Sequence, residues 1–264
     1  MKYTLIFSYL LLISASTLAQ PYAVAQLDHS PRHHEWIKLK SNGRDLSCFV
    51  TYPESSKSAL VILLIHENRG LNDWARSMAD QLSEAGYIVV APDLISGMSP
   101  EYEKTMDYPN SDQARTAIYG LQQPEVLNDL DAVFAFAENI PAGTGQVAVM
   151  GFCWGGSQTF TYATHNERLL AGLVFYGTGP KDEGLYANVT APIYGFYGGA
   201  DQRVNATLPS SEAAMKYYQK QYEYEVYEGA GHAYMRSGDD PNGSSENISA
   251  RDQSWQRIQA ILKP

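Results

Sequence analysis

The part of the chain best equipped for chemistry is the run GFCWGG at residues 151–156. It places Cys153 between two glycines, Gly151 and Gly155, each two residues away, directly after an apolar run and before a segment typical of a helix. A nucleophile with small residues two positions before and after it, at a strand-to-helix turn, is the pattern of a nucleophile elbow. The glycines are needed because side chains beside the strained turn would collide with the adjoining strand and helix. The sequence therefore predicts a thiol nucleophile at Cys153.

An acidic residue and a histidine follow this nucleophile in the order that such a fold requires. Asp201 lies in the run GGAD and His232 in the run GAGH, each directly after a strand-like segment. Ligands of α/β sheets bind at the carboxyl ends of the strands, where both residues would lie. We expect Cys153, Asp201 and His232 to form a triad. Asp93 also follows a strand, but it precedes the nucleophile, so we interpret it as a structural turn residue.

Acyl transfer also needs hydrogen-bond donors for the oxyanion that develops in the transition state. One donor should be the backbone N–H of Trp154, which follows the nucleophile at a helix N-terminus. The second should come from the loop after an early strand, at residues 66–70, where the N–H of Asn68 is the natural candidate.

The elements that must position these residues alternate along the chain. We expect a helix from Asn72 to about 85, an amphipathic helix opened by Pro124, one from the elbow to about 165 and one over 250–262. The residues 96–123 read as an irregular polar excursion. The expected strands are 46–52, 59–65, 87–91, 146–150, 170–176, 192–197 and 222–227. Repeated βα alternation predicts one α/β domain, a mostly parallel sheet with helices on both faces.

The N-terminus reads as a secretory signal peptide. Lys2 supplies the positive charge, residues 5–13 form a short apolar run, and small residues follow. Cleavage after Ala25 is expected, with Ala19 as a competing site, so the domain would span 26–264. The protein would then be exported, periplasmic or secreted. No other segment is long and apolar enough to cross a bilayer.

The net charge of the chain limits the kinds of molecule that it can bind. The chain of 264 residues has a net charge of −10, which argues against nucleic acid and anionic membranes, although local arginines can still bind an anionic substrate. Of the two cysteines, we interpret Cys48 as a buried structural residue rather than a disulfide partner of Cys153. His29, His33 and His34 belong to a polar, solvated tail, and no spaced ligand set completes a metal site with them. We expect no metal and no cofactor.

Five motifs follow one another along the chain: E-x-x-G-L-N from Glu67, A-P-D-L from Ala91, G-x-C-x-G-G from Gly151, D-x-x-V from Asp201 and G-H-x-x-x-R from Gly231. Together and in this order they resemble the dienelactone hydrolase family of α/β-hydrolases, also called carboxymethylenebutenolidases, and the resemblance covers about Ala59 to the C-terminus. The resemblance implies an α/β-hydrolase fold and the triad already named. It also implies that Glu67 interacts with the cysteine of the resting enzyme and shifts when substrate binds.

The same resemblance implies that two arginines bind a substrate carboxylate. Arg236 matches one of them, and Arg115 lies in the region of the other. Arg69 replaces an apolar residue common at its position and adds a cation beside the oxyanion loop. We interpret Arg203, close to Asp201, as a surface residue.

The residues predict covalent hydrolysis of a small ester or lactone through a thioester. For a dienelactone the resemblance implies maleylacetate as product and an anionic substrate. Two alternatives stay open, namely an exported carboxylesterase for neutral or sugar-linked esters and a non-catalytic binding protein on a hydrolase scaffold. We expect a monomer.

Overall fold

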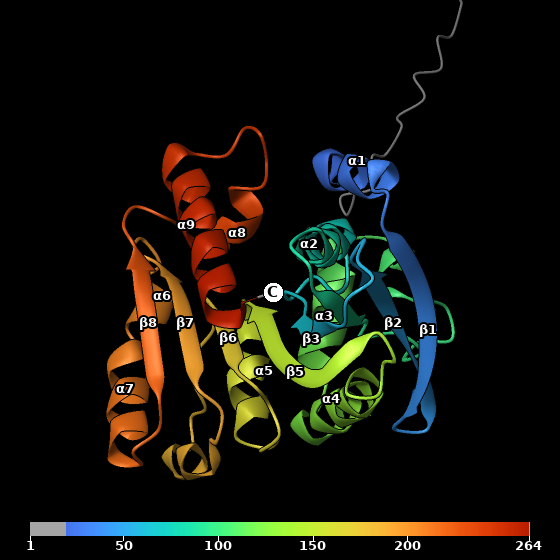
Figure 1. The fold of residues 1–264 in the computed structure, drawn as a ribbon. Coiled ribbons are helices and arrows are strands. Elements are labelled where there is room, and N and C mark those ends of the chain that lie inside the picture. Colours follow the sequence, from blue (N-terminus) through green and yellow to red (C-terminus); the bar gives the residue numbers. More distant parts are fainter. Residues whose placement is uncertain (1–19, 264) are drawn as a thin grey trace, which may run out of the picture.

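A computed structural model describes residues 20–263, in which eight strands form a single sheet (Figure 1). The spatial order is β1-β2-β4-β3-β5-β6-β7-β8. β1 and β2 pair antiparallel, β2 and β4 pair antiparallel, and every other pairing is parallel. The strands are β1 His33–Ser41, β2 Arg44–Tyr52, β3 Ala59–Ile65, β4 Ile88–Pro92, β5 Gly143–Phe152, β6 Gly172–Phe175, β7 Ile193–Gly198 and β8 Tyr222–Tyr227. The mostly parallel sheet confirms the expected fold class.

Helices cover both faces of this sheet. They are α1 Pro21–His29, α2 Asp73–Glu84, α3 Ser111–Gly120, α4 Gln123–Ala137, α5 Trp154–Ala163, α6 Gln202–Asn205, α7 Leu208–Tyr217, α8 Tyr234–Ser237 and α9 Ser245–Leu262, with short 3-10 turns at Thr105–Asp107 and Glu183–Asn188. Two helix starts match the sequence signals. Asn72 accepts a hydrogen bond from the N–H of Ala75 and caps α2, and Pro124 lies in the first turn of α4.

The side chains of the buried strands alternate between two hydrophobic cores. In β3, Val61, Leu63 and Ile65 point to the core that also contains α4, α5 and α7. Leu60, Ile62 and Leu64 point to the core formed with α2, α8 and α9. This alternation has the two-residue period of a strand, and it explains why β3 is apolar throughout. The two helical layers lie on opposite sides of the sheet (Figure 1).

The N-terminal part differs from the polar tail that we expected. Residues 21–29 form α1, which packs on α2 with Ala23 fully buried, and residues 33–41 form the edge strand β1. His34 is not solvated, because its Nε2 lies 2.8 Å from the buried carboxylate of Asp80. The expected cleavage point after Ala25 falls inside α1. Lys2, the apolar run at 5–13 and the competing site after Ala19 lie outside the described residues.

The excursion after β4 is also more ordered than expected. Thr105–Asp107 forms a 3-10 turn and α3 follows at Ser111–Gly120. Ile95, Tyr108 and Ile118 form a small separate core beneath it. Among the helices of residues 20–263, none is long and apolar enough to span a membrane.

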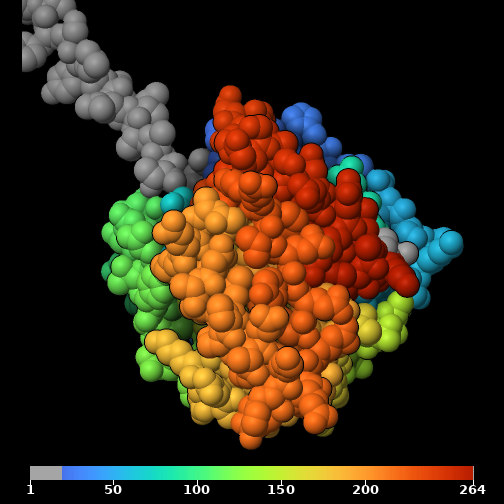
Figure 2. Space-filling view, turned by 90° about the vertical axis from the view of Figure 1, so that its left-hand side faces the viewer, coloured from blue at the N-terminus to red at the C-terminus, as the bar shows by residue number. Residues whose placement is uncertain are grey.

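The C-terminal segments build one side of the molecule. β8 is the last strand of the sheet, and α7 and α9 flank it on opposite faces. Seen from that side, the segments coloured orange to red cover most of the surface (Figure 2). The triad candidates Asp201 and His232 therefore come from the same C-terminal segments, on loops that follow β7 and β8.

Candidate active site

Cys153 lies in the sharp turn between β5 and α5. Its backbone has φ 55° and ψ −114°, a strained conformation for a residue with a side chain. The neighbouring glycines allow the close packing that holds this turn. A Cβ on Gly155 would lie 2.3 Å from the carbonyl oxygen of His66, and a Cβ on Gly151 would lie 2.2 Å from that of Gly155. The turn is therefore a nucleophile elbow in its geometry as well as in its sequence.

A chain of hydrogen bonds joins the three residues of the expected triad. Nε2 of His232 lies 3.1 Å from Sγ of Cys153, and Nδ1 lies 2.5 Å from Oδ2 of Asp201. The Asp201 side chain is almost fully buried, whereas the His232 side chain is about one-third exposed. The ring of Tyr176 meets that of His232 edge-on, with centroids 5.2 Å apart. The imidazole is thus held in place from two sides while its Nε2 faces the sulfur.

The surroundings of Cys153 hold its sulfur as a thiol. Burial and the nearby Glu67 carboxylate raise the pKa of Cys153 to about 11, although the N–H groups of Trp154 and Asn68 and the charge of Arg203 act in the opposite direction. At neutral pH the resting sulfur therefore carries its proton. The same two N–H groups point at the sulfur, where an oxyanion hole needs its donors.

Hydrogen bonds from buried polar residues hold the loop that carries Asn68 in place. Nδ1 of His66 donates to the carbonyl oxygen of Glu67 at 2.7 Å, and burial lowers the pKa of His66 to about 4, so the ring is neutral. Its ring stacks on Trp154 with an interplanar angle of 15°. Thr105 Oγ1 accepts the N–H of Leu71 at 3.1 Å and donates to Asp93 at 2.7 Å. Asp93 is therefore a structural residue, as its place before the nucleophile indicated.

Glu67 lies beside the cysteine but is bonded elsewhere. Its carboxylate accepts a hydrogen bond from Nε of Arg236 at 2.9 Å and one from the hydroxyl of Tyr176 at 3.3 Å. The glutamate side chain is 4% exposed and that of Arg236 is 22% exposed. Arg236 is thus already neutralised by an acidic partner inside the protein.

A cleft of about 550 Å³ opens over Cys153. It has hydroxyl and amide groups on its walls and, among residues 20–263, a single charged side chain apart from the histidine. The residues that line it are Asn68, Tyr119, Cys153, Trp154, Ser157, Tyr176, Thr178, Arg203, Val204 and His232. Tyr119 reaches the cleft from α3, where its hydroxyl accepts a hydrogen bond from Nδ2 of Asn68 at 2.9 Å. The excursion after β4 therefore forms part of the rim.

The expected substrate-binding arginines do not line this cleft. Arg115 is on α3, half-exposed and paired with Asp112 at 3.0 Å. Arg69 is partly buried on the oxyanion loop, and Arg236 contacts Glu67. Arg203, interpreted from the sequence as a surface residue, is exposed and is the arginine that the cleft contains. Its position two residues after the triad aspartate was the signal that could have identified it.

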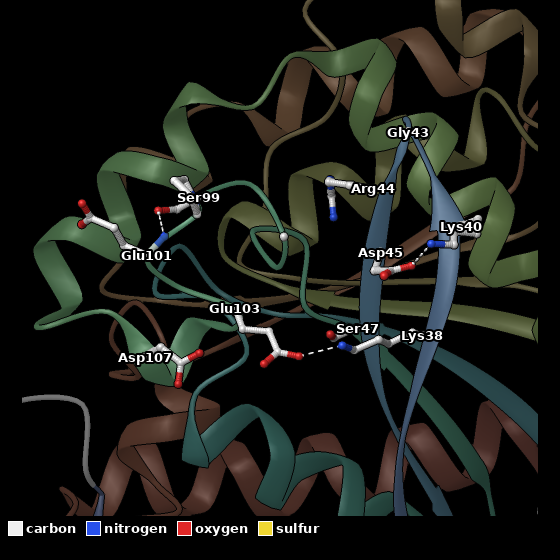
Figure 3. Close-up of a pocket in the computed structure, with 12 residues that line it drawn as sticks. Lys38, Lys40, Gly43, Arg44, Asp45, Ser47, Ser99, Glu101, Glu103 and Asp107 are labelled. Atoms are coloured by element: carbon white, nitrogen blue, oxygen red, sulfur yellow. Dashed lines mark hydrogen bonds and ion pairs between the residues drawn. The ribbon is translucent and has the colours of Figure 1, made fainter.

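A second hollow of about 640 Å³ lies between the β1–β2 hairpin and the loop 97–107 (Figure 3). Its cations are already neutralised by acidic neighbours. Lys38 pairs with Glu103 at 2.7 Å, and Lys40 pairs with Asp45 at 2.5 Å. None of the triad candidates lines this hollow, so it supplies no group for the chemistry proposed below.

The residues that the structure describes include no group of three side chains that could hold a metal ion. His29, His33 and His34 lie on α1 and β1 and have separate neighbours. The ring of His29 contacts the carbonyl oxygen of Ala25, His33 lies 3.9 Å from Glu35, and His34 lies 2.8 Å from Asp80. Cys48 and Cys153 are both free, and Cys48 is fully buried in β2. The predicted disulfide-free arrangement is therefore the one present.

Comparisons with known proteins agree with this architecture. A model of the dienelactone hydrolase family matches residues 46–264. A protein of Saccharolobus solfataricus named "Putative carboxymethylenebutenolidase" is 29% identical over 257 residues, which cover 86% of this chain and 97% of that protein. A protein of the same name from Methylorubrum extorquens is 31% identical over 235 residues, which cover 84% and 78% of the two chains.

The fold comparison gives the same result. The crystal structure titled as a "Putative Dienelactone Hydrolase" from Klebsiella pneumoniae superposes with a TM-score of 0.76 at 23% identity, covering 88% of this chain and 98% of that chain. The family model spans most of the chain, including every residue of the elbow and of both later loops. The protein therefore belongs to the dienelactone hydrolase family and is a hydrolase of the lactone and ester class.

Proposed function

We propose that the protein hydrolyses a lactone or ester that carries a carboxylate, with Cys153 as the nucleophile, His232 as the general base and Asp201 as the residue that orients the histidine. The observation that carries this proposal is the continuous hydrogen-bond chain from Sγ of Cys153 through the imidazole to Asp201. The name of the curated relatives describes the opening of a butenolide with a carboxymethylene group, which is an anionic lactone.

The first half of the reaction forms a thioester. Nε2 of His232 takes the proton from Sγ of Cys153 as the sulfur attacks the carbonyl carbon. The N–H groups of Trp154 and Asn68 stabilise the tetrahedral oxyanion. When the intermediate collapses, the bond to the ester oxygen breaks and His232 returns the proton to that oxygen. In a lactone the new hydroxyl stays attached to the acyl group.

The second half releases the acid. His232 accepts a proton from a water molecule while that water attacks the thioester carbonyl. The carbon–sulfur bond then breaks, and the protonated imidazole returns its proton to the sulfur of Cys153. Asp201 accepts the hydrogen bond from Nδ1 throughout and stabilises the imidazolium that forms in each half. Because the resting sulfur is a thiol, each cycle starts and ends with a protonated Cys153, and the proton that returns to the sulfur comes from the attacking water.

The test is hydrolysis by the purified protein of a dienelactone and of a neutral aryl ester, with Cys153→Ala as the control. We expect Cys153-dependent turnover of the anionic lactone with the higher kcat/KM. Cys153-dependent turnover of the neutral ester alone would support Cys153 as the nucleophile but would show that the substrates are neutral esters rather than anionic lactones. Equal rates for the wild type and Cys153→Ala on both substrates would contradict the catalytic proposal.

We also propose that the protein is exported and that its signal peptide is cleaved after Ala19 rather than after Ala25. Residues 20–25 contribute contacts to the fold, since the Gln20 side chain accepts the N–H of Trp74 at 3.0 Å and Tyr22 donates to the carbonyl oxygen of Arg236 at 3.3 Å. Cleavage within α1 would remove both contacts. Intact-mass measurement of the protein from the periplasm or medium should give a chain that begins at Gln20, and a chain that begins at Gln26 would contradict this assignment.

A further inference from the structure

The arginines of this protein differ sharply in whether they have an acidic partner. All ten lie within residues 20–263, and eight of them form ion pairs with aspartate or glutamate. The two without an ion pair among the described residues are Arg69 and Arg203. In a chain with 29 acidic residues, an arginine without an acidic neighbour is exceptional. Of these two, Arg203 lines the cleft over Cys153.

The cleft around Arg203 favours an anion. No aspartate or glutamate is among the residues that line it in the described part of the chain. Hydroxyl groups of Ser157, Thr178 and Tyr119 lie on the same walls and can donate hydrogen bonds to a carboxylate. The charge of Arg203 acts on the nucleophile as well, since it lowers the pKa of Cys153. A guanidinium with these neighbours matches a carboxylate in charge and in donor geometry.

Another hollow, which shares Thr178 with the cleft over Cys153, is less suited to an anion. Both Lys181 and Glu183 line it, so it contains one positive and one negative side chain. Arg236 does not line the cleft in this structure, where its Nε donates to Glu67.

We propose that Arg203 binds the carboxylate of the substrate. The inference rests on the proposed hydrolysis of an anionic lactone or ester and names the residue that selects for the anion. Arg203 stands two residues after Asp201, at the start of α6, so the loop that orients His232 also carries the group that recognises the substrate. One short segment therefore both binds the substrate carboxylate, through Arg203, and orients His232, through Asp201.

The first experiment compares the kinetics of Arg203→Gln on the anionic lactone and on the neutral aryl ester. We expect KM for the lactone to rise about ten- to a hundred-fold, the range of a charged hydrogen bond. The neutral ester should be affected much less, because for that substrate only the influence of Arg203 on the pKa of Cys153 is lost. Arg203→Lys should recover part of the loss. Arg168→Gln is the matched control, because Arg168 pairs with Glu138 and does not line the cleft.

A second measurement does not require turnover. Cys153 is alkylated in parallel with iodoacetate, which is anionic, and with iodoacetamide, which is neutral, while the buried Cys48 stays unreactive. If Arg203 binds anions, the ratio of the two rates should fall about ten-fold in Arg203→Gln and stay unchanged in Arg168→Gln. An unchanged ratio together with an unchanged KM would overturn the role of Arg203 and leave the hydrolase proposal intact. A ratio that falls in a protein without Cys153-dependent turnover would instead overturn the hydrolase proposal alone.

Discussion

At the scale of single residues, the reactivity of Cys153 depends on what surrounds the sulfur more than on the helix that follows it. The N-terminus of α5 and the N–H groups of Trp154 and Asn68 favour the thiolate, but burial and the Glu67 carboxylate outweigh them. A thiol that is deprotonated only when His232 acts is protected from chance oxidation and alkylation. Glu67 is therefore the residue through which the reactivity of the resting nucleophile can be changed.

The pH dependence of alkylation tests this role of Glu67. Because the pKa of Cys153 is raised to about 11, its alkylation by iodoacetamide should be slow at pH 7 and should increase with pH up to that value. Glu67→Gln removes a negative charge and releases Arg236, so the pKa should fall and the rate at pH 8 should rise. One pKa unit corresponds to a change of about ten-fold in thiolate.

Glu183→Gln is the control for that measurement, since Glu183 lies outside the cleft over Cys153. Its alkylation profile should coincide with that of the wild type. The interpretation fails if Glu67→Gln gives the wild-type profile or if its inflection moves to higher pH.

At the scale of elements, the sequence alone was sufficient to predict those helices, strands and loops whose burial requires a strong pattern of apolar residues or glycines. β3 has the bounds 59–65 that its apolar run indicated. The elbow and the two later loops followed from their glycines and their order. These elements lie in the middle of the sheet or at strand ends. In these places the residues that favour the local structure are also the residues that the buried position requires.

The elements that were missed depend on contacts between distant segments. α1 has no side-chain cap and begins with proline, and β1 is an edge strand with alternating polar residues. α3 and α7 are short helices that the sequence analysis did not anticipate. The expected substrate arginines do not line the cleft for a related reason, because motif spacing reveals which residues share a loop but not which carboxylate each of them contacts. Arg236 and Arg203 illustrate this difference.

Asp80 on α2 is the residue that ties the N-terminal elements to the rest of the fold. Its fully buried carboxylate accepts hydrogen bonds from Gln26, Ser30, Arg32 and His34. Burial raises the pKa of Asp80, but these four donors outweigh burial and hold the pKa well below its ordinary value. The carboxylate therefore stabilises the folded state above the pKa of an unfolded aspartate, near pH 4, and that contribution is lost as pH falls toward the folded pKa.

Asp80→Asn should lower the free energy of unfolding at pH 7 by about 2–4 kcal/mol, since it removes the charge that pairs with buried Arg32. Urea unfolding of the purified variant measures this loss. The difference from the wild type should shrink as pH is lowered from 6 to 3. Asp28→Asn, on the exposed side of α1, is the control and should have the stability of the wild type. A loss that is independent of pH would contradict a charge-based role.

At the scale of the whole molecule, charge is divided unevenly between surface and cleft. The chain carries a net charge of −10, yet the cleft over Cys153 is lined by an arginine and by no carboxylate among the described residues. An anionic substrate is therefore repelled at long range and attracted only close to Arg203. Added salt screens the long-range repulsion more than the contact within the cleft, because charges separated by more than about 10 Å are screened at 0.1 M.

The outer strands of the sheet bear on the expected monomer. β8 presents Glu223 and Glu225 at one edge. Glu225 is paired with Arg257, whereas Glu223 has no ion pair among the described residues, so its charge opposes antiparallel pairing of two copies. β1 presents Lys38 and Lys40 at the other edge, but both are already paired with Glu103 and Asp45, which weakens any attraction between the two edges of different copies. Large exposed apolar side chains in the described part are few and come from separate elements: Met98, Tyr119, Leu170, Tyr217 and Val226.

We therefore expect light scattering after size exclusion to give the mass of one chain at micromolar concentration and moderate salt. Glu223 and Glu225 should help to keep the protein monomeric, because their charges oppose the addition of another strand to the outer edge of β8. Replacing both with threonine, which favours strands, should shift the population toward dimers. A wild-type dimer that is insensitive to this replacement would show that another surface mediates association, and the edge argument would then be wrong.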